Sequence, residues 1–328
     1  MELERDLGAV ILNYLSQEGR GEVKVNLSSP EITCRVEIIP GGALIYTERI
    51  EGCGGLPAAT GGRLLCLLSG GFDSAVAAYK MIRRGVHLSF VHFYGVPSRP
   101  GESSVPIATD IVSQLTYYQY SSKLLLIPFE AIQREIMTNA PEKFRILLYR
   151  RMMFRIAQEA LRSERALGLV TGDSVGQVAS QTIQNLAAVD SAAKCTIYRP
   201  LSGDDKLDIL ETARRIGTYQ ISCEPFHDCC PRYMPRSPAL HATAEELDYG
   251  EGALDIIGLV RSGLSVAEGI ALKFNHGQVE KKPFFPRVPI ECEAQSNQAK
   301  YTFKSNLKEK RSASPNPVKV VRKPRGET

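Results

Sequence analysis

Short apolar segments alternate with longer amphipathic segments over most of the chain. Apolar strands that are separated by helices indicate a parallel sheet with both faces covered. The predicted fold class is therefore α/β, a doubly wound parallel sheet, which binds ligands at the carboxyl ends of its strands. Strands are expected at residues 63–69, 88–95, 123–129, 167–173 and 196–201, and helices at 74–85, 106–119, 130–140, 145–166, 178–192 and 205–217.

The first 60 residues have a different pattern. Helical spacing predicts a helix at residues 7–17, and alternating segments predict strands at 23–29 and within 33–50, where a Pro-Gly-Gly turn separates two of them. Residues 51–62 are rich in Gly, Ala and Pro, which is typical of a linker. We therefore predict a small α+β region before the sheet.

Three regions follow from this division of the chain. The α+β region with its linker covers residues 1–60, and the sheet domain covers 61–290. Residues 291–328 are polar, basic and dotted with Pro and Ser, so we expect a disordered tail.

Composition and charge limit the location and the partners. The 328 residues contain no apolar run of about 18 residues, so no membrane span is expected. The acidic first residues lack the layout of a signal peptide, which predicts a cytoplasmic protein with reduced thiols. The net charge of +4 is uneven, because basic residues gather between Lys300 and Arg325. Such a tail either binds a polyanion, most often nucleic acid, or serves solubility.

The stretch "RLLCLLSGGFDSAVAAYKMIRRG" at residues 63–85 is expected to form a strand, a tight turn and a helix. Two glycines, Gly70 and Gly71, let successive backbone N–H groups face an anion, and the following helix offers its N-terminus. No lysine follows the turn as a Walker loop requires, and the Rossmann pattern is absent. The alternative is an ordinary Gly-Gly turn in which Asp73 or Ser74 caps the helix.

The turn "SGGFDS" resembles the PP-loop, SGGxDS, of ATP pyrophosphatases. Further segments, "LYRRMMFRIAQ", "VTGDSVGQVASQTIQNL" and "HDCCPRYMPRSP", make residues 22–238 similar to the tRNA 4-thiouridine synthetase (ThiI) family. The resemblance implies a PP-loop fold, ATP and Mg²⁺ as cofactors, and tRNA as substrate. It also implies that ATP adenylates O4 of uridine 8, after which a protein persulfide delivers sulfur and AMP leaves.

The resemblance implies an ATP site, with Asp73 also in a catalytic role and no residue assigned as a metal ligand. Three of its members make physical sense unaided, because Gly70, His92 and Gly172 fall at or just after strand ends. Each polar member also has a plain alternative: His92 as a hydrogen-bonded core residue, Arg150 facing solvent, or Gln181 as a cap or bridge. The site residues implied are Leu67, Leu68, Ser69, Gly70, Gly71, Asp73, Ser74, His92, Phe93, Arg150, Gly172 and Gln181.

Sulfur transfer requires an accessible thiol with thiolate character. The resemblance places a catalytic cysteine at Cys229, or at Cys230 if the alignment carries a gap, in a loop after a predicted strand. His227 and Arg232 could lower the pKa of such a thiol, and Cys223 or Cys195 is a conceivable resolving thiol. Two alternatives are a pair of incidental buried cysteines and an iron–sulfur cluster, although no CxxC spacing supports the cluster.

Two departures from the family affect the expected partners. The chain ends without a rhodanese domain, so sulfur is expected directly from a cysteine desulfurase or from sulfide. Residues 1–60 match only the later part of a THUMP domain, so tRNA binding would involve this remnant, the rim of the sheet and the tail. A homodimer is expected from the family. Two alternatives to a tRNA sulfurtransferase are another PP-loop adenylating ligase or thiolase, and a tRNA-binding remnant that does not catalyse a reaction.

Overall fold

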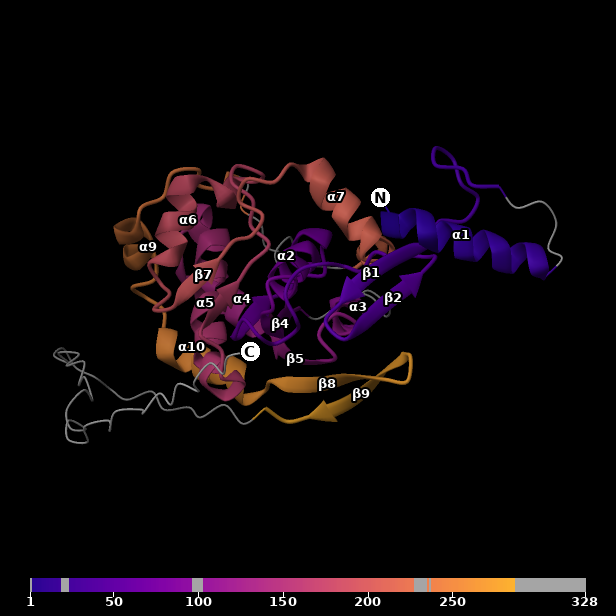
Figure 1. Ribbon diagram of the computed structural model, residues 1–328. Helices are drawn as coiled ribbons and strands as arrows, with labels where there is room; N and C mark the ends of the chain where they lie inside the picture. Colours follow the sequence, from indigo (N-terminus) through magenta and orange to yellow (C-terminus); the bar gives the residue numbers. More distant parts are fainter. Residues whose placement is uncertain (1, 19–23, 96–102, 227–234, 236, 287–328) are drawn as a thin grey trace, which may run out of the picture. The chain divides into compact units, whose positions relative to one another are not determined.

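The structure is a computed structural model that describes residues 2–18, 24–95, 103–226, 235 and 237–286. Its central element is a seven-stranded sheet with the strand order β7-β6-β3-β4-β5-β8-β9 (Figure 1). The first five strands in this order are mutually parallel. Strand β8 runs antiparallel to β5, and β9 runs antiparallel to β8. The strands are β3 (Arg63–Leu67), β4 (His87–Tyr94), β5 (Ser121–Pro128), β6 (Gly168–Val170), β7 (Thr196–Tyr198), β8 (Glu268–Asn275) and β9 (Gln278–Phe284).

Helices cover both faces of this sheet, which confirms the doubly wound α/β prediction. Successive residues of β3 point to opposite faces: Leu65 packs in one buried cluster with α4, α5, α6 and α10, whereas Leu64 and Cys66 pack in the other with α2, α3 and α7. The helices are α2 (Phe72–Ile82), α3 (Ser104–Thr116), α4 (Glu130–Asn139), α5 (Arg145–Glu164), α6 (Ile183–Asp190), α7 (Lys206–Arg215), α8 (Tyr219–Cys223), α9 (Ala244–Gly250) and α10 (Ile256–Ser265).

The β8–β9 hairpin was not predicted from the sequence. It pairs antiparallel with β5 and extends the sheet along one edge, where Figure 1 shows it in gold. Most residues of β9 are exposed, and the strand contains Glu280, Lys281, Lys282 and Pro283. An exposed edge strand does not need the apolar alternation that identifies a buried strand, and proline is tolerated at an edge.

Three local predictions were wrong. Residues 24–26 have no regular secondary structure and residues 27–29 form a bend, instead of a strand. The single helix expected at 178–192 is a 3₁₀ turn at Ala179–Gln181 followed by α6, because Thr182 is extended and its side chain accepts a hydrogen bond from the N–H of Asn185. The segment before residue 227 contains the short helix α8 instead of a strand.

The predicted N-terminal helix and β-hairpin are present, whereas the strand expected before the hairpin is not. Helix α1 spans Glu2–Gln17, and β1 (Arg35–Ile39) and β2 (Gly42–Tyr46) form an antiparallel hairpin around the expected turn. The linker is anchored to the end of α2, since the N–H of Leu56 donates to the carbonyl of Arg83 at 2.8 Å. A THUMP-like assignment of residues 1–60 stays a prediction, and the basic tail lies outside the described residues.

A buried arginine ties three helices together on one side of the sheet. Arg151 on α5 is 2% exposed and forms an ion pair with Glu251, just after α9, at 3.1 Å. It also contacts Asp248 on α9 and donates to the carbonyl of Ala188 on α6 at 3.0 Å. Arg155 binds both carboxylate oxygens of Glu251 at 2.7 and 2.8 Å. No helix among the described residues combines the length and apolar character that a membrane span needs.

Candidate functional site

A cavity of about 430 Å³ opens at the carboxyl ends of β3 and β6. These two strands are neighbours, but the chain leaves β3 toward β4 on one side and continues from β6 to β7 on the other. Such a reversal of strand order is where open α/β sheets bind ligands. Nine of the residues predicted for the site line the cavity: Leu67, Leu68, Ser69, Asp73, Ser74, Phe93, Arg150, Gly172 and Gln181.

The loop after β3 presents an uncapped helix N-terminus. Gly70 is in the left-handed region with φ +93°, which favours glycine. The N-cap of α2 is Gly71, and no side chain of the described residues caps the helix there. The Ser74 hydroxyl donates instead to the Gly71 carbonyl at 2.9 Å and accepts from the N–H of Ser69 at 3.2 Å. The alternative, in which Asp73 or Ser74 caps the helix, is therefore wrong, and N–H groups of the first turn stay available to an anion.

Gly172 allows the end of β6 to touch this loop. A Cβ atom at Gly172 would lie 2.6 Å from the backbone nitrogen of Ser74 and 2.8 Å from the carbonyl carbon of Asp73. Only a residue without a side chain permits this approach of two backbones. The two strand ends therefore form one continuous wall of the cavity.

His92 does not line the cavity. Its ring is fully buried, with Nδ1 2.7 Å from the carbonyl oxygen of Leu68 and Nε2 2.8 Å from the hydroxyl of Ser104. His92 is therefore a hydrogen-bonded core residue, as the alternative proposed. Its contact with the carbonyl oxygen of Leu68 stabilises the end of β3, from which the loop begins. Gly70 and Gly71 belong to the loop but are not part of the cavity wall.

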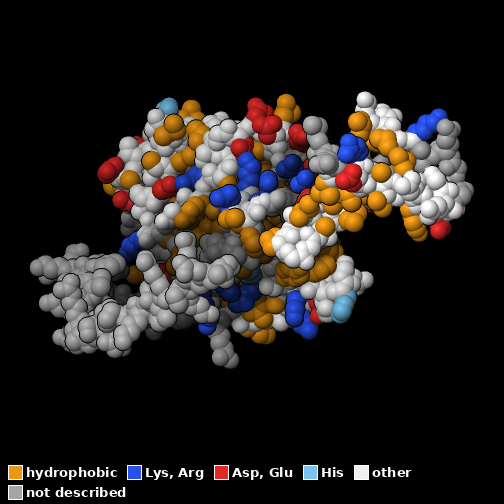
Figure 2. Space-filling model, in the orientation of Figure 1, with side chains coloured by type: hydrophobic (Ala, Val, Ile, Leu, Met, Phe, Trp, Pro, Cys, Tyr) orange, Lys and Arg blue, Asp and Glu red, His pale blue; other side chains and the backbone are white. Residues whose placement is uncertain are grey.

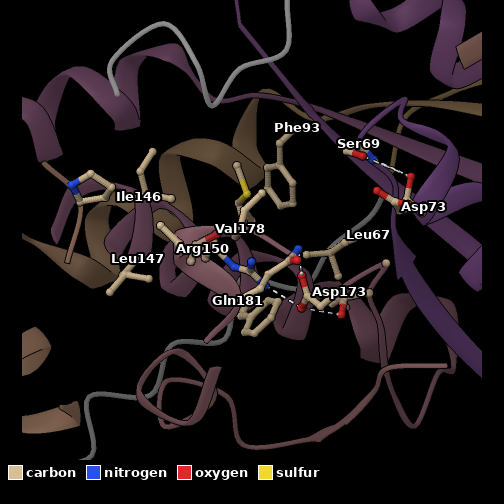
Figure 3. A pocket seen from close by; sticks show the side chains of 18 of the residues that line it. Leu67, Ser69, Asp73, Phe93, Ile146, Leu147, Arg150, Asp173, Val178 and Gln181 are labelled. Atoms are coloured by element: carbon tan, nitrogen blue, oxygen red, sulfur yellow. Dashed lines mark hydrogen bonds and ion pairs between the residues drawn. The ribbon is translucent and has the colours of Figure 1, made fainter. Parts of the chain in front are cut away.

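An aspartate that sequence analysis missed organises the opposite side. Asp173 follows Gly172 and accepts hydrogen bonds from Arg150 at 2.6 Å and from Arg199, which follows β7, at 3.1 Å. Thr171 donates to the same oxygen at 2.8 Å, and the Gln181 amide donates to the other oxygen at 3.2 Å. Figure 3 shows Arg150 and Gln181 directed toward Asp173.

This environment keeps Asp173 ionised. Burial alone would raise the pKa of its carboxyl, but the charges of Arg150 and Arg199 and the hydrogen bonds outweigh burial and lower the pKa below its usual range. Arg150 is only 14% exposed, so the alternative that it faces solvent is wrong. Gln181 forms a hydrogen bond to Asp173, which agrees with its alternative role as a bridging residue, and it also lines the cavity.

A lysine reaches the loop from a distant part of the chain. Lys206, the first residue of α7, places Nζ 2.8 and 2.9 Å from the two carboxylate oxygens of Asp73. The same Nζ lies 4.4 Å from the centre of the Phe72 ring. The loop therefore has a cation that its own sequence lacks. The signal was present in "GDDKLD", but a single lysine at a helix start does not reveal which loop it faces.

The sulfur-carrying candidates lie outside the described residues. Cys229 and Cys230, with His227 and Arg232, belong to segment 227–234. The residues that flank it are described: Phe226 contacts the glycine loop, since a Cβ at Gly70 would lie 3.1 Å from its ring, and Pro238 and Ala239 line the cavity. The described residues before and after this segment thus lie at the glycine loop and at the cavity, respectively.

The described cysteines differ in their suitability as a second thiol. Burial raises the pKa of the Cys66 thiol to about 12, which makes it unreactive. Cys195 precedes β7, at the amino ends of the parallel strands and away from the cavity, and burial raises its pKa. Cys223 is exposed and closes α8, four residues before His227. Within the described ranges, no cluster of His, Cys, Asp and Glu could hold a metal ion.

The sheet, the glycine loop after β3 and the uncapped helix that follows define the PP-loop class of α/β proteins. Within that class, the model of the family described as "Thiamine biosynthesis protein (ThiI)" matches residues 59–256, and the chain belongs to this family.

Known relatives agree with this assignment. The chain is 44% identical over 244 residues to a "Probable tRNA sulfurtransferase" of Thermus thermophilus, covering 74% of this chain and 58% of that one. It is 39% identical over 267 residues to the protein of that name from Moorella thermoacetica, covering 81% and 67%. The chain thus spans little more than half of the Thermus relative.

A solved structure agrees as well. A 4-thiouridine synthetase in complex with RNA and with bound ATP superimposes with a TM-score of 0.73 at 35% identity, covering 82% of this chain and 69% of that one.

Proposed function

We propose that the protein is an ATP-dependent tRNA sulfurtransferase that converts uridine 8 of tRNA to 4-thiouridine. The observation that carries the proposal is the cavity at the strand reversal. On one side of it lies the loop with an uncapped helix N-terminus, whose Asp73 binds Lys206, and on the other lie Arg150 and Gln181. Two relatives that are both named "Probable tRNA sulfurtransferase" support the proposal. The solved 4-thiouridine synthetase, which holds both RNA and ATP, supports it as well.

The cavity wall suits the two ends of ATP. Leu67, Phe93 and Met153 supply an apolar surface for the base. The loop with Ser69 and the N-terminus of α2 supplies N–H and hydroxyl donors for the phosphates. Figure 3 shows Ser69 and Asp73 lying apart from Arg150 and Gln181, as separate polar regions of one site require.

Mg²⁺ would accompany the phosphates. Magnesium binds phosphate oxygens together with one or two carboxylates and retains waters. Asp73 is the carboxylate on the loop side of the cavity, and its oxygens now bind Lys206 and Gln177. We therefore propose Asp73 as its protein ligand, and the ion would supply positive charge beside the phosphates when bound.

The first chemical step is adenylation. O4 of the uridine attacks the α-phosphate of ATP, the bond to the β-phosphate breaks, and pyrophosphate leaves. Lys206 and the N–H groups of α2 would stabilise the negative charge of the departing pyrophosphate, and Arg150, on the other side of the cavity, the charge that develops at the α-phosphate. Groups fixed by a folded framework do so without reorganising during the reaction.

The second step exchanges oxygen for sulfur. A persulfide on Cys229 or Cys230 attacks C4 with its terminal sulfur, and AMP leaves with the former O4. A second thiol, for which Cys223 is the best placed described candidate, then attacks the inner sulfur. The S–S bond breaks, sulfur stays on the uridine, and the two cysteines form a disulfide that a cellular reductant must reduce.

The partners follow from this chemistry. A cysteine desulfurase would supply the outer sulfur of the persulfide, whereas free sulfide would serve only by attacking C4 of the adenylated uridine directly, without the persulfide. A homodimer is proposed from the family. Figure 2 shows Lys and Arg side chains gathered across the middle of the visible face, which suits a tRNA backbone. The region at residues 1–60 is proposed as a THUMP-like tRNA contact. Binding through phosphates would weaken steeply with salt.

The proposal is tested by mass spectrometry of tRNA after incubation with the protein, ATP, Mg²⁺ and a desulfurase with cysteine. Wild type should produce 4-thiouridine at position 8. The variant that removes the persulfide cysteine, C229A or C230A, should abolish this product while tRNA-dependent release of pyrophosphate continues. Cys195→Ala is the matched control and should retain activity. Failure of wild type with every sulfur source would exclude the function, and full activity of both variants would exclude the persulfide. ATP cleavage without tRNA would favour another acceptor.

Substitution of Gly172 by alanine should damage this site specifically. The new Cβ would meet backbone atoms at 2.6 to 2.8 Å, so the loop must move away from β6. Overpacking of this kind costs about 1–3 kcal/mol, and we expect ATP binding to weaken at least about tenfold. The control is Gly203→Ala, where a Cβ meets no atom within 4 Å. Calorimetric titration measures the affinity of both variants for ATP. Equal affinities would contradict the close approach of Gly172 to the backbone of Asp73 and Ser74.

A further inference from the structure

Asp173 is saturated with hydrogen-bond donors. An ionised carboxylate accepts through two oxygens with about four lone pairs and donates none. Oδ2 accepts from Arg150, Arg199 and Thr171 at 2.6, 3.1 and 2.8 Å. Oδ1 accepts from the Gln181 amide at 3.2 Å. The two arginines are permanent donors, so the carboxylate has to remain an acceptor toward its other neighbours.

This arrangement fixes which way the Gln181 amide points. A carboxylate that only accepts must meet the NH₂ end of the amide, and the oxygen Oε1 therefore points away from Asp173. That oxygen is buried and finds no hydrogen-bond partner among the residues that the structure describes. Gln181 is also part of the cavity wall, beside Val178 and Ala179. A buried acceptor without a donor is costly unless a ligand supplies one.

We infer that Asp173 is a positioning residue that sets nucleotide specificity, by holding Gln181 with its amide oxygen available as an acceptor for a purine bearing an amino group. The inference rests on the proposed function, in which the cavity binds ATP. Phosphates offer no donor to an amide oxygen, so the matching group belongs to the base or to a ribose hydroxyl. We assign it to the base, and because ATP and ITP share the same ribose, a comparison of the two tests this assignment. The exocyclic amine of adenine donates, whereas the carbonyl oxygen at the same position of hypoxanthine accepts and would face Oε1 unpaired.

The experiment compares the binding of ATP and of ITP, which differ in this amine and in the protonation of the ring nitrogen beside it. Titration calorimetry on the whole chain measures the ratio of their dissociation constants. Wild type should prefer ATP by about 10- to 100-fold, as expected for one buried hydrogen bond replaced by a mismatch. Asp173→Asn keeps the shape but can donate as well as accept, so the Gln181 amide is free to turn. The preference should fall to a few-fold or less.

Two further variants separate positioning from general damage. Gln181→Leu removes the acceptor and should abolish the preference, and the double variant D173N/Q181L should show no further loss of preference. Asp190→Asn is the matched control, because Asp190 also binds Arg199, at 2.8 Å, but does not contact Gln181. Its ATP-to-ITP ratio should equal that of wild type. Displacement of Arg150 in D173N would weaken both nucleotides alike, so it does not change the ratio.

The outcomes distinguish this inference from the proposed function. Binding of ATP and ITP with equal affinity by wild type, or an unchanged ratio in both D173N and Q181L, overturns the inference and leaves tRNA thiolation standing. Absence of ATP binding by wild type overturns both. If D173N does not fold, the wild-type ratio and the Q181L ratio still decide.

Discussion

Replacement of Lys206 by alanine is expected to lower tRNA-dependent AMP formation about 100- to 1,000-fold, the loss typical when a group that stabilises developing charge is removed. Lys206 is the cation nearest the glycine loop among the described contacts, with Nζ 2.8 Å from Asp73. Its removal takes one positive charge from beside the phosphates and leaves Asp73 with Mg²⁺ as its proposed cation. We expect the loss mainly in the rate of adenylation and less in the affinity for tRNA. Release of AMP or pyrophosphate under single-turnover conditions measures it.

Lys80 offers a matched control. It forms an ion pair with Asp204 instead of with Asp73 of the loop, and it has 36% of its side chain exposed, compared with 41% for Lys206. Lys80→Ala should therefore keep nearly full activity, and Lys206→Arg should retain more activity than Lys206→Ala. A Lys206→Ala protein with a wild-type rate of AMP formation would show that this lysine only anchors α7 to the loop.

Replacement of Arg151 by alanine is expected to lower the free energy of unfolding by about 3–5 kcal/mol, the cost of leaving one member of a buried ion pair uncompensated. Glu251 is only 7% exposed and would keep Arg155 alone. The substitution also opens a cavity between α5, α6 and α9. Urea denaturation followed by circular dichroism measures the change.

An ion pair at the surface provides the comparison. Lys281 and Asp110 lie 2.7 Å apart with 41% and 54% of their side chains exposed. Lys281→Ala should cost no more than about 1 kcal/mol, because exposed pairs are solvated and screened. If Arg151→Ala were equally mild, α9 would be held by apolar packing, and the buried ion pair would contribute little to stability.

The parallel sheet could be predicted because its strands are buried on both faces. Such strands form unbroken apolar runs, as in "RLLCLL", and the helices between them show clear amphipathic spacing. The β8–β9 hairpin lacks this signal, because β9 is mostly exposed and carries charges and a proline. Burial, and not strand formation itself, produced the recognisable pattern.

The site was predictable to the extent that it is local. Ser69, Asp73 and Ser74 lie in one turn, and their place in the cavity follows from the strand that precedes them. Lys206 and Asp173 become site residues only through the neighbourhood of β3, β6 and β7, which no local pattern reveals. His92 shows the converse: its position at a strand end was correct, but alternation directs its side chain into the core.

The anchoring of Phe226 at the glycine loop has a consequence for the kinetics of sulfur delivery. Cys229 follows Phe226 by three residues, and a chain spans at most about 3.6 Å per residue. The Cα atom of Cys229 therefore lies within about 11 Å of the Cα atom of Phe226, and the sulfur is only a side-chain length farther away. A reactant on so short a tether has an effective concentration in the millimolar range or above. In the proposed mechanism the adenylated uridine would thus meet its nucleophile within one enzyme–tRNA complex, in competition with hydrolysis by water.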